Sequence, residues 1–244
     1  MKTLRVAFRL GRTLLHVLRG WWTIRRHFAR CTPAEREQAV QRWAAGMLGI
    51  FGIELLRRGP ALATGPVLLV ANHLSWLDIL VMHATGYCRF IAKADVHRWP
   101  LIGGMAAAAG TLFIERESRR DAMRVVHHMV ERLQAGDVLA VFPEGTTGDG
   151  LALRPFHANL VQAAISADAP VQPLALSFID GRSGQPSFAP RFVGEDTLLG
   201  SVLRTLAAEG LQAEVVTGEP QRCEGRDRRQ WSQDLHQAVD ALRQ

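Results

Sequence analysis

Residues 3–30 alternate basic and apolar positions with the period of an α-helix. Basic residues recur at alternating intervals of four and three residues, which places them in one stripe along a helix. Apolar residues recur with the same intervals two positions later, which is about 200° around the helix axis. The basic stripe is Arg5, Arg9, Arg12, His16, Arg19, Thr23, Arg26 and Arg30, and the apolar stripe is Ala7, Leu10, Leu14, Val17, Trp21, Ile24 and Phe28, widened by Leu15, Leu18 and Trp22. The pattern predicts an amphipathic helix with the two stripes on opposite faces.

A basic face opposite a face of Trp, Leu and Phe is typical of a helix that lies in the membrane interface. The alternative is a helix that packs its apolar stripe on the body of the protein and leaves its arginines in water. Nearly all charges on the polar face are positive and two tryptophans are adjacent, which favours the membrane.

A second helix is expected directly after the first. Thr32 and Pro33 have the types favoured at an N-cap and at the first helical position, and Glu35 would lie in the first turn. We expect this helix over residues 33–56, with its apolar half, 43–53, beside the first helix on the lipid side.

The pattern changes in the body of the chain. Short apolar runs bounded by Gly, Pro or polar turns predict strands, and amphipathic stretches predict helices between them. Strands are expected at 66–71, 89–92, 111–114, 138–142, 170–177, 188–193 and 211–217, and helices at 119–135, 156–167 and 227–242. Strands that alternate with helices indicate an α/β fold. We therefore expect a mixed sheet flanked by helices at 59–244, preceded by an N-terminal amphipathic helical hairpin at 1–58.

Charge is spread unevenly along this chain. Residues 1–60 hold 12 of the 29 Lys and Arg residues but 3 of the 23 Asp and Glu residues, so the body is slightly acidic. A pI near 10.2 is otherwise typical of a nucleic-acid binder. Because the basicity is confined to one amphipathic segment, it favours an anionic membrane surface as the partner, and no nucleic acid.

The remaining composition excludes several classes of protein. The longest stretch without Asp, Glu, Lys, Arg or His, 99–114, is shorter than the roughly 20 residues of a spanning helix, so we expect no transmembrane helix. Cys31, Cys88 and Cys223 form no CxxC pair, which fits a reducing compartment and argues against a disulfide framework or a metal site. Arginines interrupt the apolar region that a signal peptide needs, so we expect a retained N-terminus that faces the cytosol.

Candidate chemistry gathers in loops after predicted strands, where functional residues of α/β sheets collect. Three loops meet this condition, at 72–78, 115–116 and 143–149. His73 and Asp78 are five positions apart in the first of them. Asp78 would accept a hydrogen bond from one imidazole nitrogen and raise the basicity of the other, as in an oriented general base. Taken alone, however, this spacing favours a structural histidine that caps a helix.

Other catalytic motifs are missing from the sequence. There is no GxSxG, no GxxxxGK[ST] and no HExxH, which disfavours a serine hydrolase, a P-loop protein and a zincin. No Ser or Cys nucleophile is placed beside His73, so the base would more naturally activate a substrate hydroxyl directly.

Four motifs in order resemble those of the lysophospholipid acyltransferase family, the PlsC-like glycerolipid acyltransferases. They are the NHxxxxD box at 72–78, the GxxFIxR box at 110–116, FPEGT at 142–146 and the proline-containing strand motif at 169–173. Lys93 also resembles a family lysine. The resemblance covers about residues 60–180, and the joint occurrence of the motifs reverses the assignment of His73 from a structural to a catalytic residue.

The resemblance implies a reaction. His73, oriented by Asp78, would take the proton of a lysolipid hydroxyl, which then attacks a fatty-acyl thioester of acyl carrier protein or coenzyme A. These thioesters are co-substrates, and no cofactor is implied. The expected acceptor is 1-acyl-sn-glycerol-3-phosphate and the product phosphatidate.

The resemblance also implies the residues that bind substrate. Arg116 would bind the acceptor phosphate, and Glu144 would order either the glycerol end or its own loop. Gly145 and Thr146 would offer backbone and hydroxyl contacts, and Lys93 is included among the binding residues. The alternatives are a surface salt bridge for Arg116 and a helix N-cap role for Thr146.

One departure from the family pattern leaves the acceptor open. Thr147 stands where the family often has an arginine, and His157 stands where a basic residue is common. Loops of the TTxDG kind resemble those of relatives that acylate lyso-ornithine lipid, whose head group carries an amine and a carboxylate. A non-catalytic membrane-binding protein is a further alternative, against which the intact His73 and Asp78 pair argues. The expected location is the cytoplasmic face of the inner membrane, as a peripheral, monotopic protein.

Overall fold

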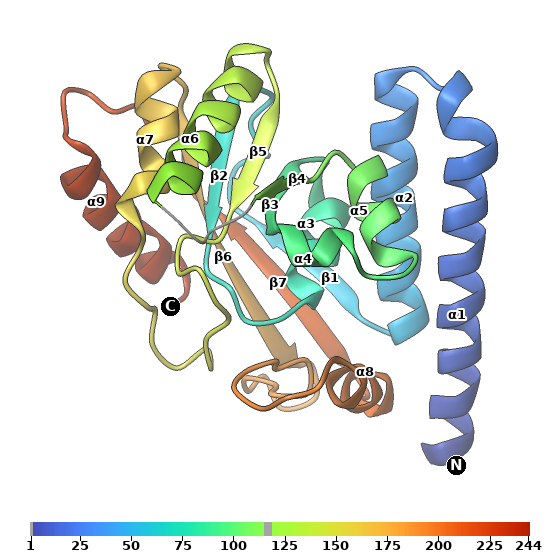
Figure 1. The fold of residues 1–244 in the computed structure, drawn as a ribbon. Coiled ribbons are helices and arrows are strands. Elements are labelled where there is room, and N and C mark those ends of the chain that lie inside the picture. The colour runs from blue at the N-terminus through green and yellow to red at the C-terminus, as the bar shows by residue number, and fades with distance from the viewer. Residues whose placement is uncertain (1, 115–118) are drawn as a thin grey trace.

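The computed structural model describes residues 2–114 and 119–244, and its centre is a seven-stranded mixed sheet (Figure 1). The strands are β1 (Glu54–Arg58), β2 (Val67–Ala71), β3 (Arg89–Lys93), β4 (Leu112–Ile114), β5 (Val138–Val141), β6 (Val171–Asp180) and β7 (Leu211–Thr217). Their order across the sheet is β1-β7-β6-β2-β5-β3-β4. The five strands from β6 to β4 are parallel, whereas β7 is antiparallel to β6 and parallel to β1.

Helices cover both faces of this sheet (Figure 1). They are α1 (Lys2–His27), the 3-10 turn η1 (Phe28–Arg30), α2 (Pro33–Phe51), α3 (Leu77–Thr85), α4 (Ala94–His97), α5 (Ile102–Ala108), α6 (Arg119–Gln134), α7 (Ala158–Ser166), α8 (Leu198–Ala207) and α9 (Arg228–Leu242). One face packs on α2, α3 and α8, and the other on α6, α7 and α9. The predicted fold class, a mixed sheet flanked by helices, is confirmed.

Strand β2 is the centre of the core. Val67, Leu69 and Ala71 point toward the α2 and α3 layer, while Leu68 and Val70 point toward the α6, α7 and α9 layer. Side chains on alternate sides of a strand explain why a strand covered on both faces is a continuous apolar run. This run fixes the position of the loop that follows β2, which carries the candidate histidine.

The second helix begins as expected and ends earlier. Thr32 Oγ1 accepts from the Glu35 amide at 3.3 Å, and a Glu35 carboxylate oxygen accepts from the Thr32 amide at 2.7 Å, which is a capping box. The prediction of helix to residue 56 is wrong, because Gly52 adopts a left-handed conformation (φ 71°) that terminates α2. Residues 54–58 instead pair with β7 as β1, so the predicted N-terminal part, 1–58, includes one strand of the sheet.

The apolar half of α2 does not lie on a lipid side. Met47, Leu48 and Phe51 are buried in the main core, together with Ala44 and Ile53. The sheet offers these side chains a larger apolar surface than one neighbouring helix can, and burial is favourable in proportion to apolar area. The expected position of 43–53 is therefore corrected.

The first helix both packs on the body and exposes an apolar stripe. Arg9 Nη1 donates to the Leu206 and Ala208 carbonyl oxygens at 2.9 and 3.0 Å, and Arg5 pairs with Glu209. The carbonyl oxygens at the C-terminal end of a helix lack partners within the helix and carry partial negative charge. The guanidinium group of Arg9 supplies hydrogen-bond donors and a positive charge at this end of α8.

The structure agrees with only part of the predicted apolar face of α1. Leu10 and Val17 of the predicted apolar stripe pack against the core, and the exposed stripe is Leu4, Phe8, Leu14, Leu15, Leu18 and Trp22. Among the described helices, none is long and apolar enough to cross a membrane.

Residues 188–193 form no strand, in contrast to the prediction. The carbonyl oxygens of residues 189–192 accept hydrogen bonds from side chains instead of from a neighbouring strand. Thr205 reaches Ala189, Ser75 and Ser201 reach Pro190, Ser201 and Arg204 reach Arg191, and Thr147 reaches Phe192. The segment is a bridge between α8 and the loops after β2 and β5.

Substitution of His83 in α3 is expected to flatten the pH dependence of stability. Burial lowers the pKa of His83 to about 4, below the ordinary value of 6.5. The unfolded chain therefore binds a proton where the folded protein does not, and the free energy of unfolding falls as pH drops from about 6.5 to about 4. The loss is up to about 3 kcal/mol, at 1.36 kcal/mol per pKa unit.

Urea unfolding of wild type and His83→Leu at about pH 7 and about pH 5 checks this. His127→Gln, which removes an exposed histidine of α6, is the control. An equal loss of stability on acidification in wild type and His83→Leu would contradict the assignment.

Candidate active site

The candidate site lies at the carboxyl edge of the two neighbouring parallel strands β2 and β5. Their register pairs Val70 with Val141, so the two chains leave the sheet side by side. The loop 72–78 follows β2 and enters α3, and the loop 142–149 follows β5. Two of the three predicted loops are thereby brought together, and residues 115–116 of the third lie outside the described residues.

The side chain of Asp78 is the hub of the first loop. One oxygen, Oδ2, accepts from the Leu74 amide at 2.6 Å, from the Ser75 amide at 2.9 Å and from His73 Nδ1 at 2.8 Å. Asp78 is 0 % exposed. Because a buried carboxylate is costly unless hydrogen-bonded, these donors fix the shape of the loop and the direction of the imidazole.

The contact with Asp78 sets the tautomer of His73. An ionised carboxylate can only accept a hydrogen bond, so Nδ1 carries the proton and Nε2 of the neutral ring is left with its lone pair. The His73 side chain is 18 % exposed, which leaves the imidazole partly open to solvent. The arrangement is that of an oriented general base.

The second loop clamps the main chain of His73. A Glu144 carboxylate oxygen accepts from the His73 amide at 2.7 Å, and the Gly148 amide donates to the His73 carbonyl at 2.7 Å. The other Glu144 oxygen accepts from the Arg154 amide at 3.0 Å. Both polar groups of the histidine backbone are therefore held by the loop after β5.

An aromatic ring supports the imidazole from the same loop. The rings of His73 and Phe142 are stacked, with centroids 4.0 Å apart and planes 7° from parallel. Phe142 stacks in turn on Phe90 of β3 at 5.7 Å. The face of Phe142 is electron-rich and would attract the imidazolium that forms when Nε2 takes a proton.

Glu144 is a second buried carboxylate, with 6 % exposure and a different role. Burial raises its pKa above the ordinary value, while the amides of Arg154 and His73 act in the opposite direction. The ionised form is the one that accepts from both amides. Both Glu144 oxygens accept from main-chain amides, so the residue supports the two loops, and a contact with the glycerol end of the acceptor stays a prediction.

Gly145 and Thr146 lie at the turn of the same loop. Gly145 has a φ of 73°, a conformation that favours glycine, and a Cβ there would lie 3.0 Å from the His157 ring, which would have to shift. Thr146 is exposed and caps no helix; α7 begins at Ala158 with His157 at its N-cap. Thr147, at the departure from the family pattern, donates its hydroxyl to the Phe192 carbonyl.

The structure describes one of the two predicted cations. Lys93 ends β3, is exposed, and forms no hydrogen bond or ion pair with any described residue. Arg116 lies outside the described residues. In the described part of the chain, no three His, Cys, Asp or Glu side chains are grouped to hold a metal ion.

Several contacts of the site are not evident from residue types alone. Asn72 donates to the Leu176 carbonyl at 2.9 Å and accepts from the Leu176 amide at 2.7 Å, which extends the β2 and β6 pairing by a side chain. Phe142 lies in the FPEGT motif and Gly148 lies just after it. Their contacts with His73 join two loops about 70 positions apart in sequence, which the motifs alone do not show. In the sequence, the one indication that Asn72 matters is that it opens the NHxxxxD box.

Known proteins share this sequence pattern and this fold. A family model described as Acyltransferase matches residues 49–177. A lyso-ornithine lipid O-acyltransferase of Pseudomonas aeruginosa is 37% identical over 246 residues, which cover 98% of this chain and 93% of the relative. A 1-acyl-sn-glycerol-3-phosphate acyltransferase of Neisseria meningitidis serogroup B is 43% identical over 162 residues, 64% of this chain and 63% of the relative.

A solved structure supports the fold. The crystal structure of PlsC, the 1-acyl-sn-glycerophosphate acyltransferase of Thermotoga maritima, superposes with a TM-score of 0.63 at 18% identity and covers 96% of this chain and 97% of that chain. The fold, the histidine and aspartate pair and these relatives define an enzyme that transfers acyl groups. The chain belongs to the acyltransferase family of PlsC-like lysolipid O-acyltransferases.

Glu144→Gln is expected to loosen the loop that carries His73. A glutamine has one acceptor oxygen and one donor NH2, so one of the two amides now bonded to Glu144 would face a donor. We expect the free energy of unfolding to fall by about 1–3 kcal/mol, the cost of an unsatisfied buried group. Hydrogen exchange of the His73 amide should accelerate, whereas Glu37→Gln, at a partly exposed position of α2, should change neither quantity. Unchanged protection of the His73 amide in Glu144→Gln would contradict the clamp.

Proposed function

We propose that this acyltransferase moves a fatty-acyl group from a thioester of acyl carrier protein or coenzyme A to the free hydroxyl of a lysolipid. The observation that carries the proposal is the His73 Nδ1 contact with buried Asp78 at 2.8 Å, which leaves Nε2 able to accept a proton. No cofactor is needed for this chemistry.

The proposed step balances protons and bonds. Nε2 of His73 takes the proton of the lysolipid hydroxyl as the oxygen attacks the thioester carbonyl. The C–O bond forms, the C–S bond breaks, and the carrier thiolate receives the proton from the imidazolium. Asp78 and the face of Phe142 stabilise that imidazolium while it lasts.

The leading acceptor is 1-acyl-sn-glycerol-3-phosphate, which becomes phosphatidate. The match with the Neisseria enzyme supports this choice. Arg116 would bind the phosphate as a bidentate donor, and Lys93, which ends β3 and pairs with no described residue, is a second cation available to substrate. The turn at Gly145 and Thr146 would contact the glycerol end, in a loop whose shape Glu144 maintains.

Lyso-ornithine lipid is the second candidate acceptor. The Pseudomonas relative that acts on it aligns with 98% of this chain, including the segments outside the family match. The chain also has Thr147, held by Phe192, at the position where the phosphate-binding pattern often has an arginine.

The enzyme is proposed to bind an anionic membrane peripherally, through α1, at the cytoplasmic face where its thioester co-substrates occur. The exposed side chains of α1 include Phe8 at 63 % and Trp22 at 52 %, with arginines on either side of them. A surface with this composition suits the boundary between head groups and acyl chains. A monotopic enzyme placed there would meet lysolipid acceptors in the plane of the membrane.

His73→Ala is expected to lower kcat for acyl transfer by about 10²–10⁴-fold, because it removes the general base. Asp78→Asn should also be severe, since an amide no longer fixes the tautomer of the imidazole. Thioester consumption by purified protein with a soluble lysolipid measures both, and near-ultraviolet circular dichroism reports whether the fold is intact. If folded His73→Ala keeps more than about a tenth of wild-type kcat, the base assignment is wrong.

Thr147→Arg is expected to separate the two acceptors. An added guanidinium would attract a phosphate and repel the amine of ornithine, so kcat/KM should rise or stay level for 1-acyl-sn-glycerol-3-phosphate and fall about tenfold for lyso-ornithine lipid, a change of about 1.4 kcal/mol. Thr147→Val is the matched control, because it loses the same bond to Phe192 without adding charge. A wild-type preference for lyso-ornithine lipid of more than tenfold would overturn the leading acceptor.

A further inference from the structure

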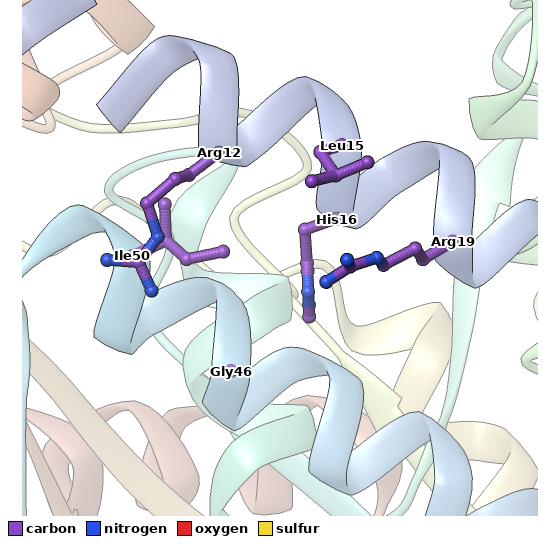
Figure 2. Close-up of a pocket in the computed structure, with 6 residues that line it drawn as sticks. All are labelled: Arg12, Leu15, His16, Arg19, Gly46 and Ile50. Atoms are coloured by element: carbon purple, nitrogen blue, oxygen red, sulfur yellow. The ribbon is translucent and has the colours of Figure 1, made fainter. Parts of the chain in front are cut away.

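A hollow of about 230 Å³ lies between α1 and α2, away from the candidate active site (Figure 2). Its lining residues come from three successive turns of α1 and two positions of α2: Arg12, Leu15, His16, Arg19, Gly46 and Ile50. Figure 2 shows Arg12 extending toward Ile50 and Arg19 extending toward His16, so basic side chains border the hollow from two sides.

The two arginines of this hollow have no anionic partner in the described part of the chain. Helix α1 contains no Asp or Glu. The acidic residues of α2 are Glu35 and Glu37, at least nine residues from Gly46, which is about 13 Å along a helix. By contrast, Arg5 and Arg9 of the same helix are bound to the end of α8. Arg12 lies over the Phe8 ring of α1, 5.7 Å from its centroid, and neither Arg12 nor Arg19 forms an ion pair with a described residue.

The floor of the hollow is rigid. The His16 ring donates from Nε2 to the Trp43 carbonyl at 2.9 Å and stacks on the Trp43 ring, 15° from parallel. Trp43 Nε1 donates back to the His16 carbonyl at 3.2 Å. A Cβ at Gly46 would lie 3.0 Å from His16 Cε1, so the absence of a side chain at this position keeps the space open.

The rest of the lining is apolar and leads to the exposed stripe of α1. Ile50 is buried at the base, while Leu15 is exposed and belongs to both the hollow and the stripe. A ligand held here would place an anion between guanidinium groups and an apolar chain along Leu15 and its neighbour Leu18. A phospholipid has both parts, whereas a free anion uses only the first.

We infer that this hollow binds the phosphate of one membrane phospholipid, with Arg12 and Arg19 as charge-assisted donors. The inference rests on the proposed binding of the membrane by α1. It adds a defined lipid site to that surface, distinct from the site that binds the acceptor. Guanidinium groups that flank an anion give binding that saturates, in contrast to diffuse attraction to a charged surface.

The test uses full-length protein and dihexanoylphosphatidylglycerol below its micellar concentration, so that no membrane is present. Titration calorimetry should show saturable binding that is at least tenfold weaker in Arg12→Gln/Arg19→Gln. The control, Arg25→Gln/Arg26→Gln, removes the same charge from exposed positions of α1 that stack on Trp21 and Trp22, and should change the affinity less than threefold. Equal losses in the two double variants would overturn the inference in favour of diffuse attraction.

A second pair of variants tests the space without changing charge. Gly46→Leu should fill the hollow and abolish saturable binding, whereas Gly49→Leu, on the next turn of α2 with nothing within 4 Å of its Cβ position, should not. Binding of inorganic phosphate as tight as that of the lipid would show an anion site only, and equal binding in Gly46→Leu and wild type would place the lipid elsewhere. Either result overturns the lipid site.

Two further measurements separate this inference from the proposed function. Wild-type acyl transfer to a soluble lysolipid tests the enzyme, and vesicle flotation of Phe8→Ser/Trp22→Ser tests the membrane surface. If wild type turns over lysolipid and floats with anionic vesicles while the short-chain phospholipid does not bind, the proposed function stands and the lipid site is wrong.

Discussion

The buried carboxylate of Asp78 is the constraint on which the site depends. Among the described residues no Lys or Arg pairs with it, and it is removed from water, so its charge must be balanced by hydrogen-bond donors that the chain supplies locally. Two of them are consecutive amides and the third is the imidazole of His73, and all three meet at one oxygen. The loop can adopt this path because β2 delivers it at a fixed point of a fully buried strand. The same carboxylate oxygen therefore fixes both the orientation of the His73 imidazole and the shape of the loop.

The same loop is tied to the first helix through shared supports. Ser75, whose amide donates to Asp78, donates its hydroxyl to the Pro190 carbonyl at 2.5 Å, and Ser201 of α8 donates to that carbonyl at 3.2 Å. At its other end, α8 accepts Arg9 of α1 at the Leu206 carbonyl. Helix α8 is thus a common support for the loop that carries His73 and for the helix with the exposed apolar stripe, so that the position of one is set relative to the other.

Sequence reasoning succeeded where local chemistry decides and failed where distant partners compete. The β2 run, the N-cap at Thr32 and the contact of His73 with Asp78 depend on neighbours in sequence, and each agrees with the prediction. The run at 188–193 has strand composition, but its carbonyls are taken by side chains from α8 and from two loops. The apolar residues in the second half of α2 suit either contact with lipid or burial in a core. They are buried because the sheet lies beside them, which the local sequence does not show. Part of the predicted apolar face of α1 packs on the core, because the helical period alone does not show which arginines donate to the carbonyl oxygens at the end of α8.

That last difference changes how the basic segment is understood. Its arginines form one stripe in sequence but two groups in space. Arg5 pairs with Glu209, which also pairs with Arg182, and Arg9 donates to carbonyl oxygens at the end of α8. Arg12 and Arg19 border a hollow and have no described counter-charge. A count of positive residues would therefore overestimate the charge that this helix presents to a membrane. What distinguishes the two groups is whether an acceptor within the fold already occupies the guanidinium, and a ligand can recruit only the guanidinium groups that the fold leaves free.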